Sequence, residues 1–106
     1  DVPNMAFSMG YTNASWTLKV DVTCEHVCRL LNYMEQHNYQ HCVAHCNDDE
    51  WDEENMLDFS SGYVQRALEK LPKSGAKKPW KLYQNYVLDL ITLGFGKVTH
   101  RALKFK

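Results

Sequence analysis

The longest periodic pattern of apolar side chains in this chain runs over residues 17–36. The positions that recur at steps of three and four residues, and so share one helical face, are Val20, Thr23, Cys24, Val27, Cys28, Leu31 and Met34. A second apolar strip is formed by Val22, Leu30 and Tyr33. The pattern predicts a helix over residues 17–36, ended by Asn38, that must be buried on two sides. Such a helix suits packing against a larger domain.

A turn connects this helix to the residues before it. Residues 5–9 are a short apolar run of strand length that stops at Gly10, where the backbone can turn sharply. Residues 10–16 then hold side chains whose oxygens commonly cap helices, namely Thr12, Asn13 and Ser15. A helix start exposes unpaired N–H groups at the positive end of its dipole. The turn is therefore able to bind an anion or an electron-rich carbonyl.

Shorter patterns predict the remaining elements. Helical periodicity returns over residues 62–71, where Ser60 or Ser61 can cap the start, and over residues 79–93. A short strand is predicted within residues 42–46. The tail, residues 98–106, alternates weakly, as an edge strand or a segment draped over the surface would. The fold class expected is mainly α with short β segments.

The cysteines permit two interpretations. Four cysteines occur, as the pairs Cys24 with Cys28 and Cys42 with Cys46, and the histidines among them include His26, His41 and His45. This spacing admits a four-ligand zinc site. However, Cys24 and Cys28 lie one helical turn apart on the apolar face, where a buried thiol acts as a small hydrophobe. We expect reduced, metal-free thiols in a cytoplasmic protein.

Charge adds little to the choice of function. Six of the seven residues 48–54 are acidic, and residues 73–78 are rich in lysine, so both segments are predicted to be solvated loops. The acidic run lacks the register of an EF-hand, and a contact of the lysines with a cofactor phosphate is the less favoured alternative. A formal net charge of −1 gives no reason to expect nucleic acid or an anionic membrane as partner. No apolar run approaches the roughly twenty residues of a membrane span, and no signal peptide heads the chain.

Several blocks of unusual residues in fixed order resemble one known family. The blocks run from Gly10 to Lys19, Cys24 to Met34, Phe59 to Arg66, Leu71 to Gly75 and Pro79 to Tyr86. They resemble the C-terminal region of bacterial flavin-dependent monooxygenases of the Baeyer–Villiger type, over nearly the whole chain. The resemblance implies a C-terminal fragment of an α/β flavoprotein with two dinucleotide-binding domains. The Gly-x-Gly-x-x-Gly fingerprints of those domains do not occur here, since Gly94-Phe95-Gly96 lacks the third glycine.

The resemblance also implies a reaction. In such enzymes NADPH reduces FAD, O2 adds to the flavin, and the flavin peroxide inserts one oxygen atom into a ketone or a sulfur or nitrogen centre of a small organic substrate. The chain alone is expected to be inactive and to work with the rest of the flavoprotein chain. In isolation its apolar helix face favours self-association.

The resemblance places the cofactor contact at the turn. The residues expected to direct backbone N–H groups at the flavin's pyrimidine carbonyl are Asn13, Ala14, Ser15, Trp16 and Thr17. Negative charge collects on that carbonyl when the flavin is reduced. Trp16 and Val20 are expected beside the flavin or the substrate pocket, and no residue of the chain is assigned a catalytic role. The alternative function is a small helical binding module with a Cys/His zinc site, which a zinc assay would distinguish.

Overall fold

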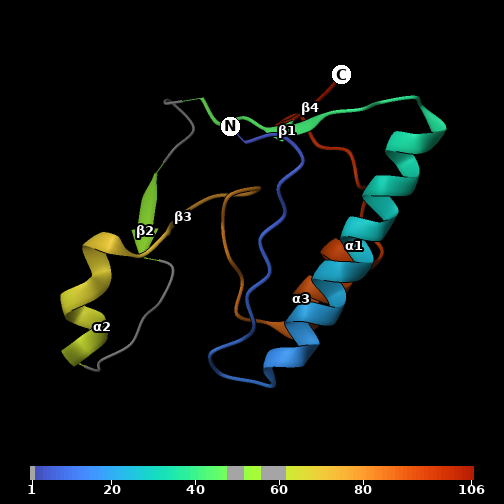
Figure 1. The fold of residues 1–106 in the computed structure, drawn as a ribbon. Coiled ribbons are helices and arrows are strands. Elements are labelled where there is room, and N and C mark those ends of the chain that lie inside the picture. The colour runs from blue at the N-terminus through green and yellow to red at the C-terminus, as the bar shows by residue number, and fades with distance from the viewer. Residues whose placement is uncertain (1, 48–51, 56–61) are drawn as a thin grey trace. The chain divides into compact units, whose positions relative to one another are not determined.

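The computed structural model describes residues 2–47, 52–55 and 62–106, which divide into two compact units (Figure 1). The first unit is formed by residues up to 45 together with residues 83–106, and the second by residues 46–82. The helical elements are α1 (Trp16–Gln36), α2 (Gly62–Ala67), η2 (Leu68–Lys70), α3 (Tyr86–Asp89) and η3 (Leu90–Gly94). The strands are β1 (Cys42–Ala44), β2 (Glu53–Asn55), β3 (Lys73–Gly75) and β4 (Leu103–Phe105). The predicted mainly helical fold with short β segments is confirmed.

Helix α1 confirms the strongest sequence prediction, since it occupies Trp16–Gln36 against the predicted residues 17–36. Val22 and Met34 on its inner face are buried in the first unit. The helix stops where the sequence predicts, because Asn38 takes the left-handed conformation with a φ of 56° directly after the C-cap His37.

The opposite side of α1 differs from the prediction. Cys24, Cys28 and Leu31 are exposed, although the periodicity predicted that they would be covered. Val20, Thr23 and Val27 of the same predicted face are half-buried. Periodicity identifies which side chains share a face, but it does not supply the layer that covers them. Within the described residues no element packs over this side of α1.

The C-terminal helical segment packs against α1 in the first unit (Figure 1). It begins at Tyr86 and continues as one turn of π-helix to Gly94, so the predicted start at residue 79 is wrong. The reason is Asn85, whose extended backbone interrupts the helical path and whose side-chain Oδ1 accepts a hydrogen bond from Leu88 N at 3.1 Å.

Arg29 of α1 holds the end of this segment. Its guanidinium donates to the carbonyl oxygens of Leu93 at 2.8 Å, Gly94 at 2.6 Å and Gly96 at 2.5 Å. His26 Nδ1 also lies 3.1 Å from the Leu93 oxygen. Since the last carbonyls of a helix lack partners within the helix, Arg29 satisfies them and ties the two helices together.

A two-stranded sheet closes the other end of the first unit. Strands β1 and β4 pair antiparallel, with Cys42 opposite Phe105 and Ala44 opposite Leu103, which confirms the predicted short strand and the edge-strand alternative for the tail. Asn4 pairs with Cys42 on the other side of β1 through two hydrogen bonds of 2.8 and 2.9 Å. Residues 5–9, predicted as a strand, are in no strand, because within the described chain no neighbouring segment offers them a ladder of hydrogen bonds.

The second unit combines α2 and η2 with the antiparallel pair β2 and β3. The helix predicted over residues 62–71 is present, with its last turn tightened to a 3₁₀-helix. Two predicted loops are strands in part: Glu53 lies opposite Gly75 and Asn55 opposite Lys73 in this ladder. Lys73 Nζ lies 3.9 Å from Glu53 Oε1, an ion pair diagonal to the register. The rest of the predicted acidic loop at residues 48–51 and the predicted serine cap at residues 60–61 lie outside the described residues.

Candidate functional site

The predicted flavin-contacting turn leads directly into α1. Ser15 is the N-cap, with a φ of −58° and a ψ of 126°, but its hydroxyl lies 3.0 Å from Thr17 Oγ1 and makes no capping bond to a described backbone N–H group. The first turn of α1 also carries no acidic side chain. The predicted side-chain cap is therefore wrong. As a result, this part of the chain leaves the first N–H groups of α1 available to an outside acceptor.

Thr12 and Asn13 were also predicted as caps, but they fasten the turn to Gln84. The side-chain Oε1 of Gln84 accepts from Thr12 N at 3.0 Å and lies 3.3 Å from Thr12 Oγ1. Asn13 Nδ2 donates to the Gln84 carbonyl oxygen at 3.1 Å. These bonds hold the turn against the segment that precedes α3.

Trp16 lies over Gly10 at the opening of the turn. A Cβ atom built on Gly10 would overlap the Cγ and Cδ2 atoms of the indole, so only glycine permits this contact. The indole nevertheless remains 54% exposed. Val20, one helical turn further on, is half-buried, while Asn13, Ala14, Ser15 and Thr17 are exposed. The structure thus brings Trp16 and Val20 to one side of α1, beside the uncapped helix start.

A buried polar cluster behind the turn was not foreseen from the sequence. Asp89 Oδ2 accepts a hydrogen bond from Tyr11 Oη at 2.5 Å and pairs with Lys19 Nζ at 2.5 Å. Lys19 Nζ also lies 5.4 Å from the centroid of the Tyr11 ring. The exposed fractions of the three residues are 3% for Tyr11, 7% for Lys19 and 3% for Asp89. One feature of the sequence could have indicated this cluster. Asp89 interrupts a run of apolar residues, and an acidic side chain that is buried requires a partner.

The cluster determines the protonation of Tyr11. Its burial, together with the hydrogen bond to Asp89 and the negative charge of that carboxylate, raises the pKa of the Tyr11 phenol well above its ordinary value. Tyr11 is therefore a neutral donor at physiological pH. The Lys19–Asp89 ion pair leaves no net charge behind the turn, so any attraction for an anion there comes from the helix start itself.

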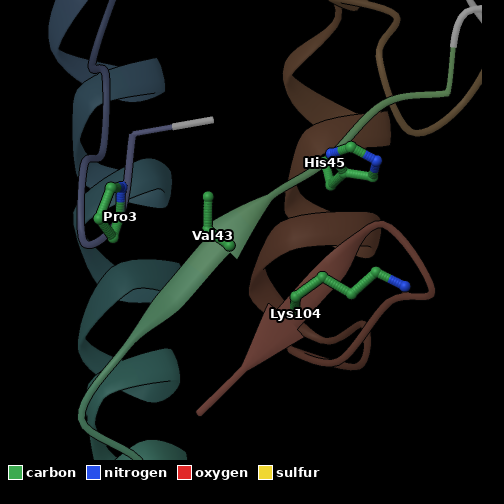
Figure 2. A pocket seen from close by; sticks show the side chains of 4 residues that line it. All are labelled: Pro3, Val43, His45 and Lys104. Atoms are coloured by element: carbon green, nitrogen blue, oxygen red, sulfur yellow. The ribbon is translucent and has the colours of Figure 1, made fainter.

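A hollow of about 320 Å³ opens elsewhere in the first unit. Figure 2 shows the four side chains that line it, with Val43 between Pro3 on one side and His45 and Lys104 on the other. None of the predicted turn residues lines this hollow. It is not the pocket that the sequence places beside Trp16 and Val20.

The zinc alternative gains no support from the described residues. Among them, no group of three or more His, Cys, Asp or Glu side chains lies close enough together to hold a metal ion. None of the four cysteines forms a disulfide in the described structure. Cys42 is buried, and its burial raises the pKa of the thiol. None of the described helices combines the length and apolar character that crossing a bilayer requires.

Curated proteins match this chain over nearly its whole length. It is 45% identical over 104 residues to the FAD-containing monooxygenase EthA of Mycobacterium tuberculosis, an alignment that covers 98% of this chain and 21% of EthA. It is 47% identical over 106 residues to the probable FAD-binding monooxygenase AlmA of Acinetobacter baylyi, covering 99% of this chain and 21% of AlmA. The putative FAD-containing monooxygenase MymA of Mycobacterium tuberculosis is 39% identical over 90 residues, 84% of this chain and 18% of MymA.

No family model matches the chain, and no solved structure matches it. The chain spans about a fifth of the length of the curated relatives it matches. The resemblance noted in the sequence is confirmed: almost all of this chain is similar to a segment of the FAD-containing monooxygenases.

Proposed function

We propose that this chain is the C-terminal segment of an NADPH- and FAD-dependent monooxygenase that transfers one oxygen atom from O2 to a ketone or to a sulfur or nitrogen centre of a small organic molecule. Similarity to proteins named FAD-containing monooxygenases over nearly the whole chain supports the assignment to flavin chemistry. The structural observation that carries it is the exposed, uncapped start of α1 between Ser15 and Thr17.

The donors at this place fit one edge of a flavin ring. A carbonyl that gains negative charge is favoured beside the first N–H groups of a helix, and neither an acidic side chain nor a Ser15 cap competes for those groups here. The chain lacks the glycine-rich strand–turn–helix motif that would bind the FAD pyrophosphate. The residues present therefore suit contact with the ring, and the rest of the flavoprotein would hold the phosphates and the NADPH.

In the proposed mechanism, bound FAD supplies the activation of O2 and the redox chemistry. The backbone N–H groups of Ser15, Trp16 and Thr17 orient the ring edge and stabilise negative charge that develops there. The exposed indole of Trp16, with Val20 beside it, excludes water and shapes the space for an apolar substrate. The exposed thiols Cys24 and Cys28 are consistent with a reducing cytoplasm as the place of action.

The test uses the flavoprotein that carries this segment. We expect it to purify with FAD, to oxidise NADPH in an O2-dependent way that a ketone or thioether accelerates, and to incorporate labelled oxygen from isotopically labelled O2 into the product. A flavin-free protein, or labelled oxygen that appears only in hydrogen peroxide with every substrate class, would contradict the proposal.

A further inference from the structure

We propose that Tyr11, Lys19 and Asp89 are positioning residues for the flavin-contacting turn: they fix residues 12–17 at the start of α1 in the orientation that the cofactor requires. This inference rests on the function proposed above and deepens it. None of the three side chains is proposed to touch the flavin.

The three residues come from the three segments that surround the turn. Tyr11 lies directly before residues 12–17, Lys19 stands on α1 just after them, and Asp89 is the last residue of α3. Both contacts converge on a single atom, Asp89 Oδ2, at 2.5 Å each. The two ends of the turn are thereby fastened to the same carboxylate oxygen.

A second set of bonds runs to the same neighbouring segment. Gln84 receives the Thr12 and Asn13 bonds, and its position precedes α3 in the chain. Residues 11, 12, 13 and 19 are thus all tied to residues 84–89. The stretch between the ties, residues 14–18, makes no such bond to this segment in the described structure, so its orientation depends on the ties at its two ends.

Stability alone does not explain a polar cluster at this position. A buried ion pair gains little over well-packed apolar side chains of similar volume, because both charges lose their hydration. What an ion pair and a charged hydrogen bond provide is a fixed direction and distance. Apolar packing at residues 11, 19 and 89 would bury the same surface without fixing the direction in which Tyr11 and Lys19 approach α3. The cluster therefore serves orientation more than stability.

The chain also offers a matched control. Arg29 of α1 makes three short hydrogen bonds, to carbonyl oxygens at and just after the end of η3. It stands ten residues after Lys19 along α1, which places it roughly 15 Å away along the helix axis. A loss of Arg29 contacts should loosen the same helix pair without reaching the turn.

The experiment compares Tyr11→Phe, Asp89→Asn and Arg29→Gln in the flavoprotein that carries this segment. Asp89→Asn leaves the buried Lys19 charge without its partner and can therefore prevent folding. Tyr11→Phe removes only one hydroxyl and keeps the ion pair, so this variant is expected to fold in either case. Amide hydrogen exchange without FAD is measured at Thr12, whose N–H donates to Gln84, and at residues 19–22, the first amides of α1 that have acceptors within the helix. Visible circular dichroism and the reduction midpoint of the flavin are measured on protein freed of unbound FAD, and the dichroism is normalised to bound flavin, so that a change in the folded fraction does not alter them.

We expect exchange at Thr12 and at residues 19–22 in Tyr11→Phe to be on the order of tenfold faster, the factor that loss of a hydrogen bond to a charged group produces in local opening. The visible circular dichroism of the flavin should change. The reduction midpoint potential of the flavin should become more negative, because the helix start then stabilises the reduced flavin less well. Arg29→Gln should accelerate exchange only near residues 93–96 and leave the flavin signals unchanged.

Two results would overturn the inference while leaving the proposed function intact. The first is a Tyr11→Phe protein that holds FAD with unaltered exchange, dichroism and midpoint. The second is an Arg29→Gln protein with the same changes in flavin dichroism and midpoint. Those changes would then result from a general loosening of the contact between the two helices. An unmodified flavoprotein that binds no FAD would overturn the proposed function and this inference with it.

Discussion

Lys19 Nζ lies 2.5 Å from Asp89 Oδ2, although 70 residues separate them in the chain, and both side chains are almost completely buried. Removing one member leaves the other charge buried without a partner, which costs about 3–5 kcal/mol of the free energy of unfolding. We predict such a loss for Asp89→Leu in urea unfolding.

The double variant Lys19→Met with Asp89→Leu should lose less than Asp89→Leu alone, because no unpaired charge remains. Losses that simply add would show that the two charges do not depend on each other.

Tyr11 should resist ionisation at alkaline pH. Burial and Asp89 raise the pKa of its phenol in the folded protein above that in the unfolded chain, so its contribution to stability is fully present below about pH 10 and is lost as the pH rises through the folded-state pKa. The chain has six tyrosines, and in an ultraviolet titration of tyrosinate Tyr11 should ionise late. Tyr11→Phe should remove this late phase. A late phase of undiminished amplitude in that variant would assign it to another tyrosine.

Gly10→Ala should displace the indole of Trp16. The added methyl group would occupy the place of the ring atoms, whereas the same change at Gly94 meets only Leu90 Cδ1 at 3.4 Å, an ordinary contact. We expect a shift in Trp16 fluorescence, read as the difference from a Trp16→Phe background, and a stability loss of about 1–3 kcal/mol for overpacking. Gly94→Ala should stay close to wild type. Equal effects of the two substitutions would speak against the packing of Trp16 on Gly10.

How far the sequence anticipates the structure depends on the range of the interactions involved. Helix α1 was predictable because its pattern extends over more than five turns and because Asn38 ends it through its own local conformation. The helix predicted over residues 79–93 begins only at Tyr86 in the structure, and the reason is again local. The apolar periodicity continues back to Trp80, while the capping side chain that sets the real start is Asn85.

The candidate site was predictable only as a location. The turn and its exposed helix start follow from residues next to each other in the chain, and the structure has them at the predicted place. Which side chains hold the turn was not predictable, because Gln84 and Asp89 are more than sixty positions away and nothing local couples them to Thr12 or Lys19. Strands β2 and β3 were not predicted because they lie in an acidic run and a lysine-rich segment, compositions typical of solvated loops.

Trp16→Ala should change the reaction more than the fold. Since the indole is 54% exposed, its truncation should cost well below the 3–5 kcal/mol typical of a buried aromatic side chain. In the flavoprotein we expect an altered order of substrate preference and less oxygenated product per NADPH consumed, with FAD content near wild type. Val20→Ala, a smaller change on the same side of α1, should have a weaker effect of the same kind. A Trp16→Ala protein with unchanged kinetics and lower stability would assign Trp16 to packing alone.

The most direct test of the central claim, that the start of α1 contacts the flavin through its backbone, removes a single N–H group. Thr17 lies in the first helical turn, where proline is tolerated, so Thr17→Pro deletes that donor with little harm to the helix. Thr17→Ala removes the side chain and keeps the donor. The measurement is the dissociation constant of FAD for the flavoprotein carrying each variant. We predict an increase of roughly two- to tenfold for Thr17→Pro, in line with loss of one hydrogen bond to the neutral carbonyl of oxidised FAD, and none for Thr17→Ala. Equal affinities in both variants would contradict the claim.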